Sequence, residues 1–132
     1  MQKNFLGIDY GEKRIGLAIG NNAEKVAHTF KTIHKLNELD DIVPAKDIQA
    51  FVIGLPLQPD GTEGKTAEMA HLFANRLAEK FNLPIHWIDE RKSSVAAESF
   101  LKDTLFMRPD KRKNILDAES ARIILQRFFD TN

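Results

Sequence analysis

The sequence predicts an α/β fold in which helices flank a five-stranded mixed sheet. At the start of the chain, two apolar runs are joined by only four residues, which is the pattern of an antiparallel hairpin. Further along, short apolar runs alternate with segments of helical spacing, which is the pattern of parallel strands connected by helices. The sheet should therefore combine an antiparallel hairpin with parallel strands.

The first three strands are expected within the first 33 residues. Phe5 to Gly20 reads FLGIDYGEKRIGLAIG, and its two apolar halves meet at a Gly-Glu-Lys-Arg connection. A third strand, about Ala27 to Ile33, would extend the edge of this hairpin. The segment after Lys35 is expected to be helical, because its apolar residues recur at intervals of three and four until Pro44.

The middle of the chain supplies the two parallel strands. Ala50 to Leu55 is an apolar run with no polar face, as expected for a strand that helices cover on both sides. A strongly amphipathic helix follows the loop from Pro56 to Gly64, and it is expected to end near Asn82. Ile85 to Ile88 then forms the last short strand.

A helix and a basic loop are expected next. Ser93 or Ser94 can cap this helix, which carries its apolar residues between positions 95 and 101. The loop reads MRPDKRK, from Met107 to Lys113, and contains four cations and one acid. Its charges are equally consistent with a solvated connector and with a surface that contacts a partner.

A closing helix is expected from about Ile115 to Phe129. Counting back by four residues from Ala121 places Asp117 at the start of its inward face. An acid in a first helical turn is also favourable for the helix alone, so this placement has a structural alternative. The predicted buried stripe of the helix consists of Ala118, Ala121, Ile124, Leu125 and Phe128.

Length and composition limit what kind of protein this chain can be. Its 132 residues predict a single domain spanning residues 1–132. Nineteen basic residues balance nineteen acidic ones, so any nucleic-acid site must arise from local charge. The sequence has no cysteine and no apolar run long enough to span a membrane, so we expect a cytoplasmic protein that does not bind membranes. The four histidines lack zinc-site spacing and are expected to be surface or packing residues.

One residue of the first strand is unusual for its position. Asp9 follows an apolar run, where an ionised carboxylate is costly to bury unless it is paired or binds a metal. Asp9 could instead begin a turn at Tyr10-Gly11 and accept hydrogen bonds from the backbone. If the turn centres on residues 11–13, Asp9 stays in the strand and needs a functional explanation.

Further acids are expected at the same edge of the sheet as Asp9. Asp89 and Glu90 follow the last strand, and the carboxyl ends of parallel strands meet at one edge. Asp117 can cover this edge if the closing helix packs back across the sheet. Clustered carboxylates most often bind hard divalent cations, so the sequence predicts a site for two Mg²⁺ or Mn²⁺ ions.

Two such ions can activate water for the hydrolysis of a phosphodiester, which predicts a nuclease. Basic residues near the acids are candidates for contacts with the phosphates of a nucleic acid. Each of them is also consistent with an ordinary solvated surface cation. The candidates are Lys13, Arg14, Arg91, Lys111, Arg112 and Lys113.

Four motifs follow one another along almost the whole chain: GIDYGEKRIGLAIG, VIGLPLQPDGTEG, WIDERKSS and LDAESARIIL. In this order and spacing they resemble the YqgF family, also called RuvX, of bacterial proteins similar to Holliday junction resolvases. The resemblance implies the RNase H-like fold and a nuclease that depends on a divalent metal. It also implies that Asp9, Glu90 and Asp117 are catalytic, with Asp9, Asp89, Glu90 and Asp117 as the candidate metal ligands.

The resemblance implies two kinds of nucleic-acid substrate. Family members are associated with maturation of the 5′ end of precursor 16S ribosomal RNA, a step in ribosome biogenesis, and by kinship with branched DNA. Structured RNA is the leading interpretation here. A resolvase acts on a two-fold junction and would need a dimer, so both a monomer and a homodimer are compatible with the family.

Two further classes of function were considered. A nucleic-acid-binding adaptor without catalysis is one alternative, although the chain retains all the candidate acids. A kinase of the actin-like type needs two duplicated domains, for which 132 residues are too few. In one departure from the family pattern, Lys92 and Ser93-Ser94 follow the Asp89-Glu90-Arg91 motif, where an apolar residue and then Thr or Ser are usual.

Overall fold

The computed structural model describes residues 2–90 and 108–131, which form a five-stranded sheet in the order β3-β2-β1-β4-β5. The strands are β1 (Asn4–Tyr10), β2 (Ile15–Asn21), β3 (His28–Ile33), β4 (Ile48–Pro56) and β5 (Ile85–Glu90). β1, β2 and β3 are antiparallel neighbours, whereas β4 runs parallel to β1 and to β5. The predicted mixed α/β sheet is confirmed.

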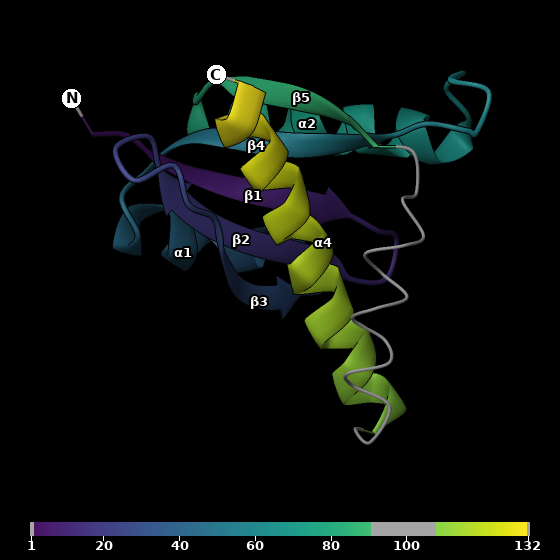
Figure 1. Ribbon diagram of the computed structural model, residues 1–132, viewed down its shortest axis with the longest axis horizontal. Coiled ribbons are helices and arrows are strands. Elements are labelled where there is room, and N and C mark those ends of the chain that lie inside the picture. The colour runs from purple at the N-terminus through teal and green to yellow at the C-terminus, as the bar shows by residue number, and fades with distance from the viewer. Residues whose placement is uncertain (1, 91–107, 132) are drawn as a thin grey trace.

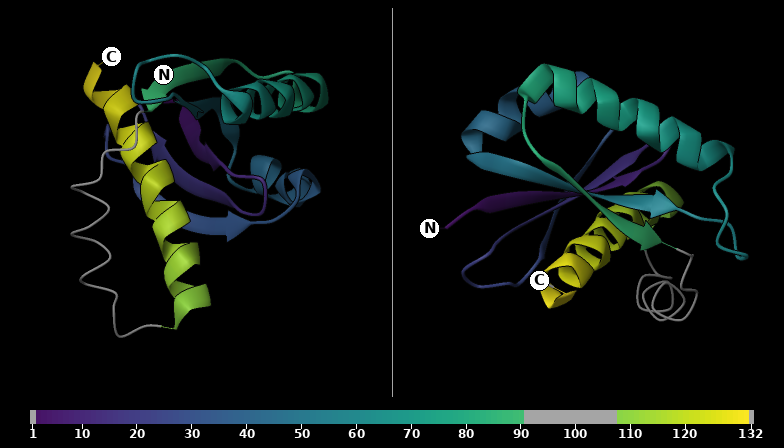
Figure 2. Two further views of the ribbon diagram at one scale, coloured as in Figure 1. Left: turned by 90° about the vertical axis from the view of Figure 1, so that its right-hand side faces the viewer. Right: turned by 90° about the horizontal axis from the view of Figure 1, so that it is seen from above.

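Helices cover both faces of the sheet (Figures 1 and 2). A 3₁₀ helix, η1 (Leu36–Glu38), leads into α1 (Leu39–Ala45), and α2 (Lys65–Phe81) joins β4 to β5. α1 and α2 lie on one face, and α4 (Pro109–Thr131) crosses the other face diagonally. Within the described residues, no helix is both long and apolar enough to cross a membrane.

The strands divide their side chains between two cores, as their two-residue period requires. On β1, Leu6 and Ile8 belong to the core beneath α1 and α2, whereas Phe5 belongs to the core beneath α4. On β4, Phe51 faces the first core and Val52 faces the second. A residue's position along a strand therefore tells which helices its side chain meets.

Small residues let α4 lie very close to the sheet. A Cβ atom at Gly7 of β1 would come within 2.8 Å of the Cβ of Leu125. A Cβ atom at Gly16 of β2 would overlap the carbonyl group of Asp117. The backbone of α4 thus rests directly on the backbone of β2, and any side chain at Gly16 would push the two apart.

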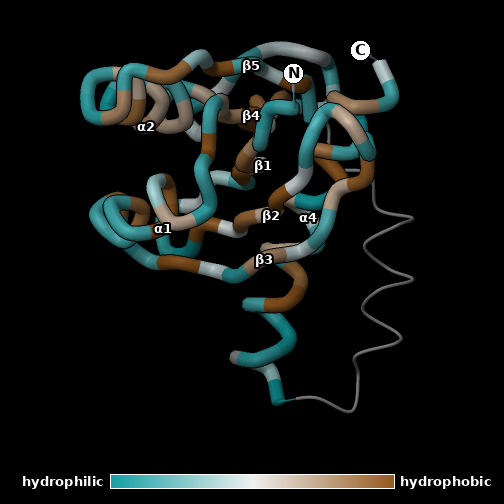
Figure 3. The backbone as a smooth tube through the Cα atoms, turned by 90° about the vertical axis from the view of Figure 1, so that its left-hand side faces the viewer, coloured by the Kyte–Doolittle hydropathy of each residue, from teal (hydrophilic) through white to brown (hydrophobic). Residues whose placement is uncertain are grey.

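The start of α4 differs from the prediction. The helix begins at Pro109 instead of near Ile115, so Lys111, Arg112 and Lys113 belong to the helix and not to a basic loop. Proline favours the first position of a helix, because its missing N–H has no partner there and its φ angle is already helical. The first turns of α4 extend past β3 and are hydrophilic (Figures 1 and 3).

The end of α4 also differs in one residue. Phe129 is buried, whereas Phe128, which was predicted to be buried, is only partly covered. Both rings contact Phe5, at centroid distances of 5.8 Å for Phe129 and 5.2 Å for Phe128. Phe128 and Phe129 are three and four residues after Leu125, so both lie on the same face of the helix as Leu125, and Phe129 points deeper into the core. The predicted helix over residues 93–101 and Arg91 lie outside the described residues.

Gly16→Ala is expected to lower the free energy of unfolding by about 1–3 kcal/mol, because the methyl group would overlap the backbone of α4. Urea denaturation followed by circular dichroism measures this change. Gly64→Ala is the matched control, since a Cβ there meets the amide end of the flexible Gln58 side chain. The control should change stability by less than about 1 kcal/mol. Equal losses in the two variants would contradict the close packing of α4 on β2.

Candidate active site

Asp9 lies in β1, on the face of the sheet that α4 covers. It pairs with Gly16 of β2, and the connection between the two strands is formed by residues 11–14. Asp9 is therefore a strand residue and does not begin the turn. Phe5 and Gly7 contact α4, so the alternation of β1 directs the partly buried Asp9 toward the same face.

The structure separates the two acids at the end of β5. Ile88 packs into the core beneath α4, whereas the Trp87 ring lies 4.7 Å from the ring of His71 on α2. Alternation then places Glu90 on the α4 face and the exposed Asp89 on the opposite face. The position of the Glu90 carboxylate agrees, because its Oε2 lies 2.8 Å from where a Cβ of Gly54 would be.

Gly54 of β4 provides the space between Asp9 and Glu90. β1 and β5 are not adjacent, because β4 lies between them. Ile8 pairs with Ile53 in parallel register, which sets Asp9 beside Gly54, and Gly54 pairs in turn with Ile88. Without a side chain at Gly54, the carboxylate of Glu90 can lie over β4 on the side of Asp9.

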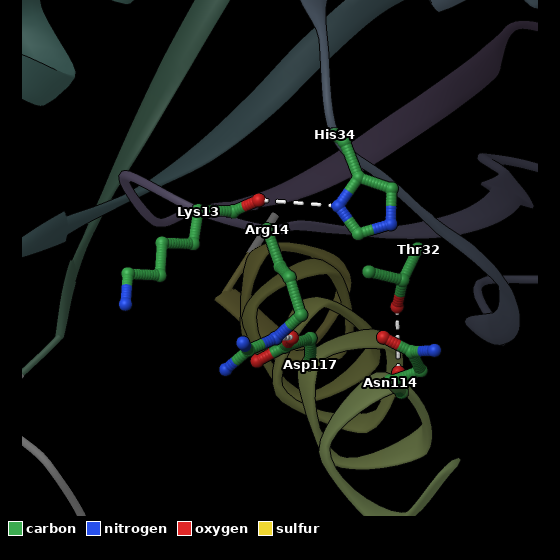
Figure 4. A network of polar contacts seen from close by, with 6 residues as sticks. All are labelled: Lys13, Arg14, Thr32, His34, Asn114 and Asp117. Atoms are coloured by element: carbon green, nitrogen blue, oxygen red, sulfur yellow. Dashed lines mark hydrogen bonds and ion pairs between the residues drawn. The ribbon is translucent and has the colours of Figure 1, made fainter. Parts of the chain in front are cut away.

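Asp117 reaches the same region from α4. Its backbone rests on Gly16, which is the register partner of Asp9. The Nε of Arg14 donates a hydrogen bond of 2.6 Å to Oδ2 of Asp117 (Figure 4). The side chains of Arg14 and Asp117 are 31% and 22% exposed, so this ion pair is only partly screened by water.

The donor atoms of these carboxylates suit a hard divalent cation. In the part of the chain that the structure describes, no three His, Asp or Glu side chains are arranged to hold a metal ion. Asp9, Glu90 and Asp117 all offer oxygen atoms, which Mg²⁺ and Mn²⁺ prefer. The space that the absent side chain of Gly54 leaves is filled by the Cδ1 of Ile124 and by Oε2 of Glu90. Arg14 binds Asp117 through one oxygen, and a carboxylate has a second that can accept another partner.

A hollow of about 520 Å³ adjoins this region. Apart from Pro109, the described residues of its lining are basic or polar, and none of them is an acid. Lys13, Arg14 and Lys113 were predicted as phosphate contacts, and the structure brings these three together. The lining residues are Lys13, Arg14, His34, Pro109, Lys113 and Asn114.

The other predicted cations are less well placed. Lys111 is exposed on α4, Arg112 is partly buried, and neither lines the hollow; Arg91 is outside the described residues. His34 and Asn114 line the hollow but were not predicted as site residues. His34 follows the third strand directly, and its position opposite the hairpin connection is the one signal that could have identified it.

Glu38 holds the chain that carries His34. Its carboxylate accepts hydrogen bonds from the backbone N–H groups of His34, at 2.7 Å, and of Lys35, at 2.8 Å. These donors favour the ionised carboxylate and lower the pKa of Glu38 below its ordinary value. The bonds fix the backbone where it leaves β3 and thus the position of the His34 ring.

Comparison with known proteins identifies similar sequences. Residues 3–131 match the family described as "RuvX: Holliday junction resolvase". A protein of Burkholderia ambifaria (strain MC40-6) is 43% identical, and one of Burkholderia vietnamiensis is 42% identical. Each match covers 96% of this chain and 88% of the relative. Both relatives carry the name "Putative pre-16S rRNA nuclease".

Two solved structures share the fold. The RuvC structure of Thermus thermophilus has a TM-score of 0.54 at 12% sequence identity. RuvC from the same organism in complex with a Holliday junction substrate has a TM-score of 0.51 at 14% identity. Each comparison covers 96% of this chain and 93% of the other. The likeness confirms the predicted RNase H-like fold.

The Arg14–Asp117 pair should show a coupling free energy of about 0.5–1.5 kcal/mol in a double-mutant cycle, because both side chains are half-buried. The cycle uses Arg14→Ala, Asp117→Ala and the double variant, with free energies of unfolding from urea denaturation. The Lys80–Asp40 pair, at 35% and 48% exposure, is the control and should give no more than about 0.5 kcal/mol. A coupling near zero for Arg14–Asp117 would contradict its role in fixing α4.

Proposed function

Because this chain belongs to the RuvX family of Holliday junction resolvases, we propose that it is a nuclease that hydrolyses phosphodiester bonds of structured nucleic acid. Its relatives named as pre-16S rRNA nucleases support the 5′ end of precursor 16S ribosomal RNA as the substrate. This role would place the protein in the cytoplasm, with residues 1–132 acting as one nuclease domain. The observation that carries the proposal is the common face of Asp9 and Glu90, to which α4 adds Asp117.

The proposed cofactor is a pair of Mg²⁺ or Mn²⁺ ions. Asp9, Glu90 and Asp117 would hold them, and Asp89, on the other face of the sheet, is not part of the proposed site. When bound, such ions activate a water molecule and neutralise charge on the leaving oxygen of a phosphodiester. Three carboxylates at one edge repel a phosphate, so a cation between them is also needed for the substrate to approach.

Arg14 would link the carboxylates to the substrate. Its Nε is bonded to Asp117, and the guanidinium group has further N–H donors on its two terminal nitrogens. Those nitrogens can donate to phosphate oxygens while Nε keeps the Asp117 side chain in place. Lys13, the preceding residue, adds a second cation at the same connection.

Branched DNA is the second candidate substrate. The family description names Holliday junction resolvases, and the chemistry at the carboxylates would be the same. A junction is two-fold symmetric, so a homodimer would have to present two sites to it, whereas a monomer suffices for RNA.

Asp9→Asn and Glu90→Gln should each lower Mg²⁺-dependent cleavage of an RNA bearing the precursor 16S 5′ end by about 100-fold or more, since several kcal/mol of charge stabilisation are lost. Asp89→Asn is the matched control and should cleave near the parent rate, because its side chain is on the opposite face. Single-turnover kinetics with saturating protein measure the rates. Parent-like cleavage by Asp9→Asn would overturn the mechanism.

Removal of the metal gives an independent test. Chelation with EDTA should abolish cleavage by the parent protein, and added Mg²⁺ or Mn²⁺ should restore it. The same assay with a four-way DNA junction identifies the substrate. Faster cutting of the junction than of the RNA, together with a dimer in sedimentation, would replace the RNA proposal by the resolvase.

A further inference from the structure

The basic hollow beside the carboxylates has walls from three parts of the chain. Lys13 and Arg14 belong to the connection between β1 and β2, and His34 follows β3. Pro109, Lys113 and Asn114 belong to the first turns of α4. Its volume of about 520 Å³ is within the range of about 300–1,000 Å³ that is usual for ligand sites.

Each pair of walls is joined by a hydrogen bond (Figure 4). The Nε of Arg14 donates to Oδ2 of Asp117 at 2.6 Å, which joins the connection to α4. Oγ1 of Thr32 donates to the backbone oxygen of Asn114 at 2.6 Å, which joins β3 to α4. Nδ1 of His34 lies 3.2 Å from the backbone oxygen of Lys13, which joins the end of β3 to the connection. The hollow is therefore held in shape before any ligand binds.

The bond from His34 determines which of its ring nitrogens can meet a ligand. A carbonyl oxygen only accepts, so Nδ1 of His34 must carry the hydrogen that Lys13 receives. Nε2 is then the nitrogen left for a ligand. It accepts when the ring is neutral and donates when the ring is protonated.

The charges around His34 are mainly positive. Lys13, Arg14 and Lys113 line the hollow together with it, while Lys31 and Lys35 are close to it along the chain. Among the described side chains, the two acids that bond to the walls of the hollow are both engaged. Asp117 is bonded to Arg14, and Glu38 is bonded to the backbone N–H groups of His34 and Lys35. A dianionic or monoanionic phosphate group fits this combination of charge and donors.

We infer that the hollow binds a backbone phosphate of the nucleic acid, next to the phosphate at the carboxylates, through His34, Lys113 and Arg14. Arg14 lines the hollow and also binds Asp117, so the two phosphates belong to one continuous strand. The inference rests on the proposed function for the identity of the ligand. It adds a positioning site that sets which bond of the strand reaches the carboxylates.

The test measures binding of a fluorescently labelled structured RNA to the full chain in EDTA, so that cleavage does not occur. Lys113→Gln should weaken binding about fivefold and lower the slope of log affinity against log salt by about 0.7 to 0.9, the value for one lost phosphate contact, and His34→Gln should do the same at a pH where the His34 ring is protonated. His28→Gln, at the far end of β3, and Lys3→Gln, before β1, are the matched controls and should bind like the parent.

The pH dependence separates a direct contact from a structural role. The parent should bind more tightly at pH 5.5 than at pH 8, because protonation lets Nε2 of His34 donate to the phosphate. His34→Gln should lose this difference, and His34→Arg should bind tightly at both pH values because its charge is permanent. Unchanged pH dependence in His34→Gln would overturn the contact.

The outcomes distinguish this inference from the proposed function. Parent-like affinity and salt slope in both His34→Gln and Lys113→Gln, with intact metal-dependent cleavage, would overturn the phosphate site and leave the nuclease standing. Loss of affinity in these variants in a chain without cleavage would support the site and contradict the nuclease. Tripolyphosphate serves as a free-phosphate probe. If tripolyphosphate displaced the RNA completely at concentrations below that of the RNA, this result would contradict a site for a nucleic-acid strand.

Discussion

The close packing of α4 on β2 at Gly16 is the contact on which the candidate site depends. Because Gly16 has no side chain, the backbone of α4 can rest on the strand at Asp117. Asp117 therefore lies beside Gly16, which pairs with Asp9 of the neighbouring strand, and within reach of Arg14. It also sets Asn114 on Thr32, so that the first turns of α4 pass the edge of the sheet and close the basic hollow. One missing Cβ thus positions both Asp117 and one wall of the basic hollow.

The two-residue period of the strands determines which acids can act together. Asp9 and Glu90 occupy strand positions whose side chains face α4, and Asp89 occupies a position that faces the other side of the sheet. β4 separates the two strands, and Gly54 leaves the gap over which the Glu90 side chain extends. Asp9 of β1 and Glu90 of β5 thereby share the face that α4 covers, where Arg14 of the hairpin connection pairs with Asp117 of α4.

Local patterns were sufficient to predict the strands and α2, and they drew attention to Asp9, because an acid in an apolar strand is costly whatever surrounds it. Strand order was not predictable, since it depends on contacts between distant segments, and the sequence therefore left Asp89 and Glu90 unresolved. Pro109 was predicted to lie in a loop, because proline usually interrupts helices, although it is the first residue of α4. His34 was not predicted as a site residue, because its partners, Lys13 and the start of α4, lie far from it in sequence.

The central claim is that Asp9 and Glu90 share a divalent cation on the α4 face of the sheet. Crystals of the full chain soaked in Mn²⁺ test it most directly, through anomalous scattering at the manganese absorption edge. We expect an anomalous peak within ligand distance, about 2.0–2.3 Å, of carboxylate oxygens of both residues. A peak bound to Asp89 instead, or none beside Asp9 at saturating Mn²⁺, would contradict it.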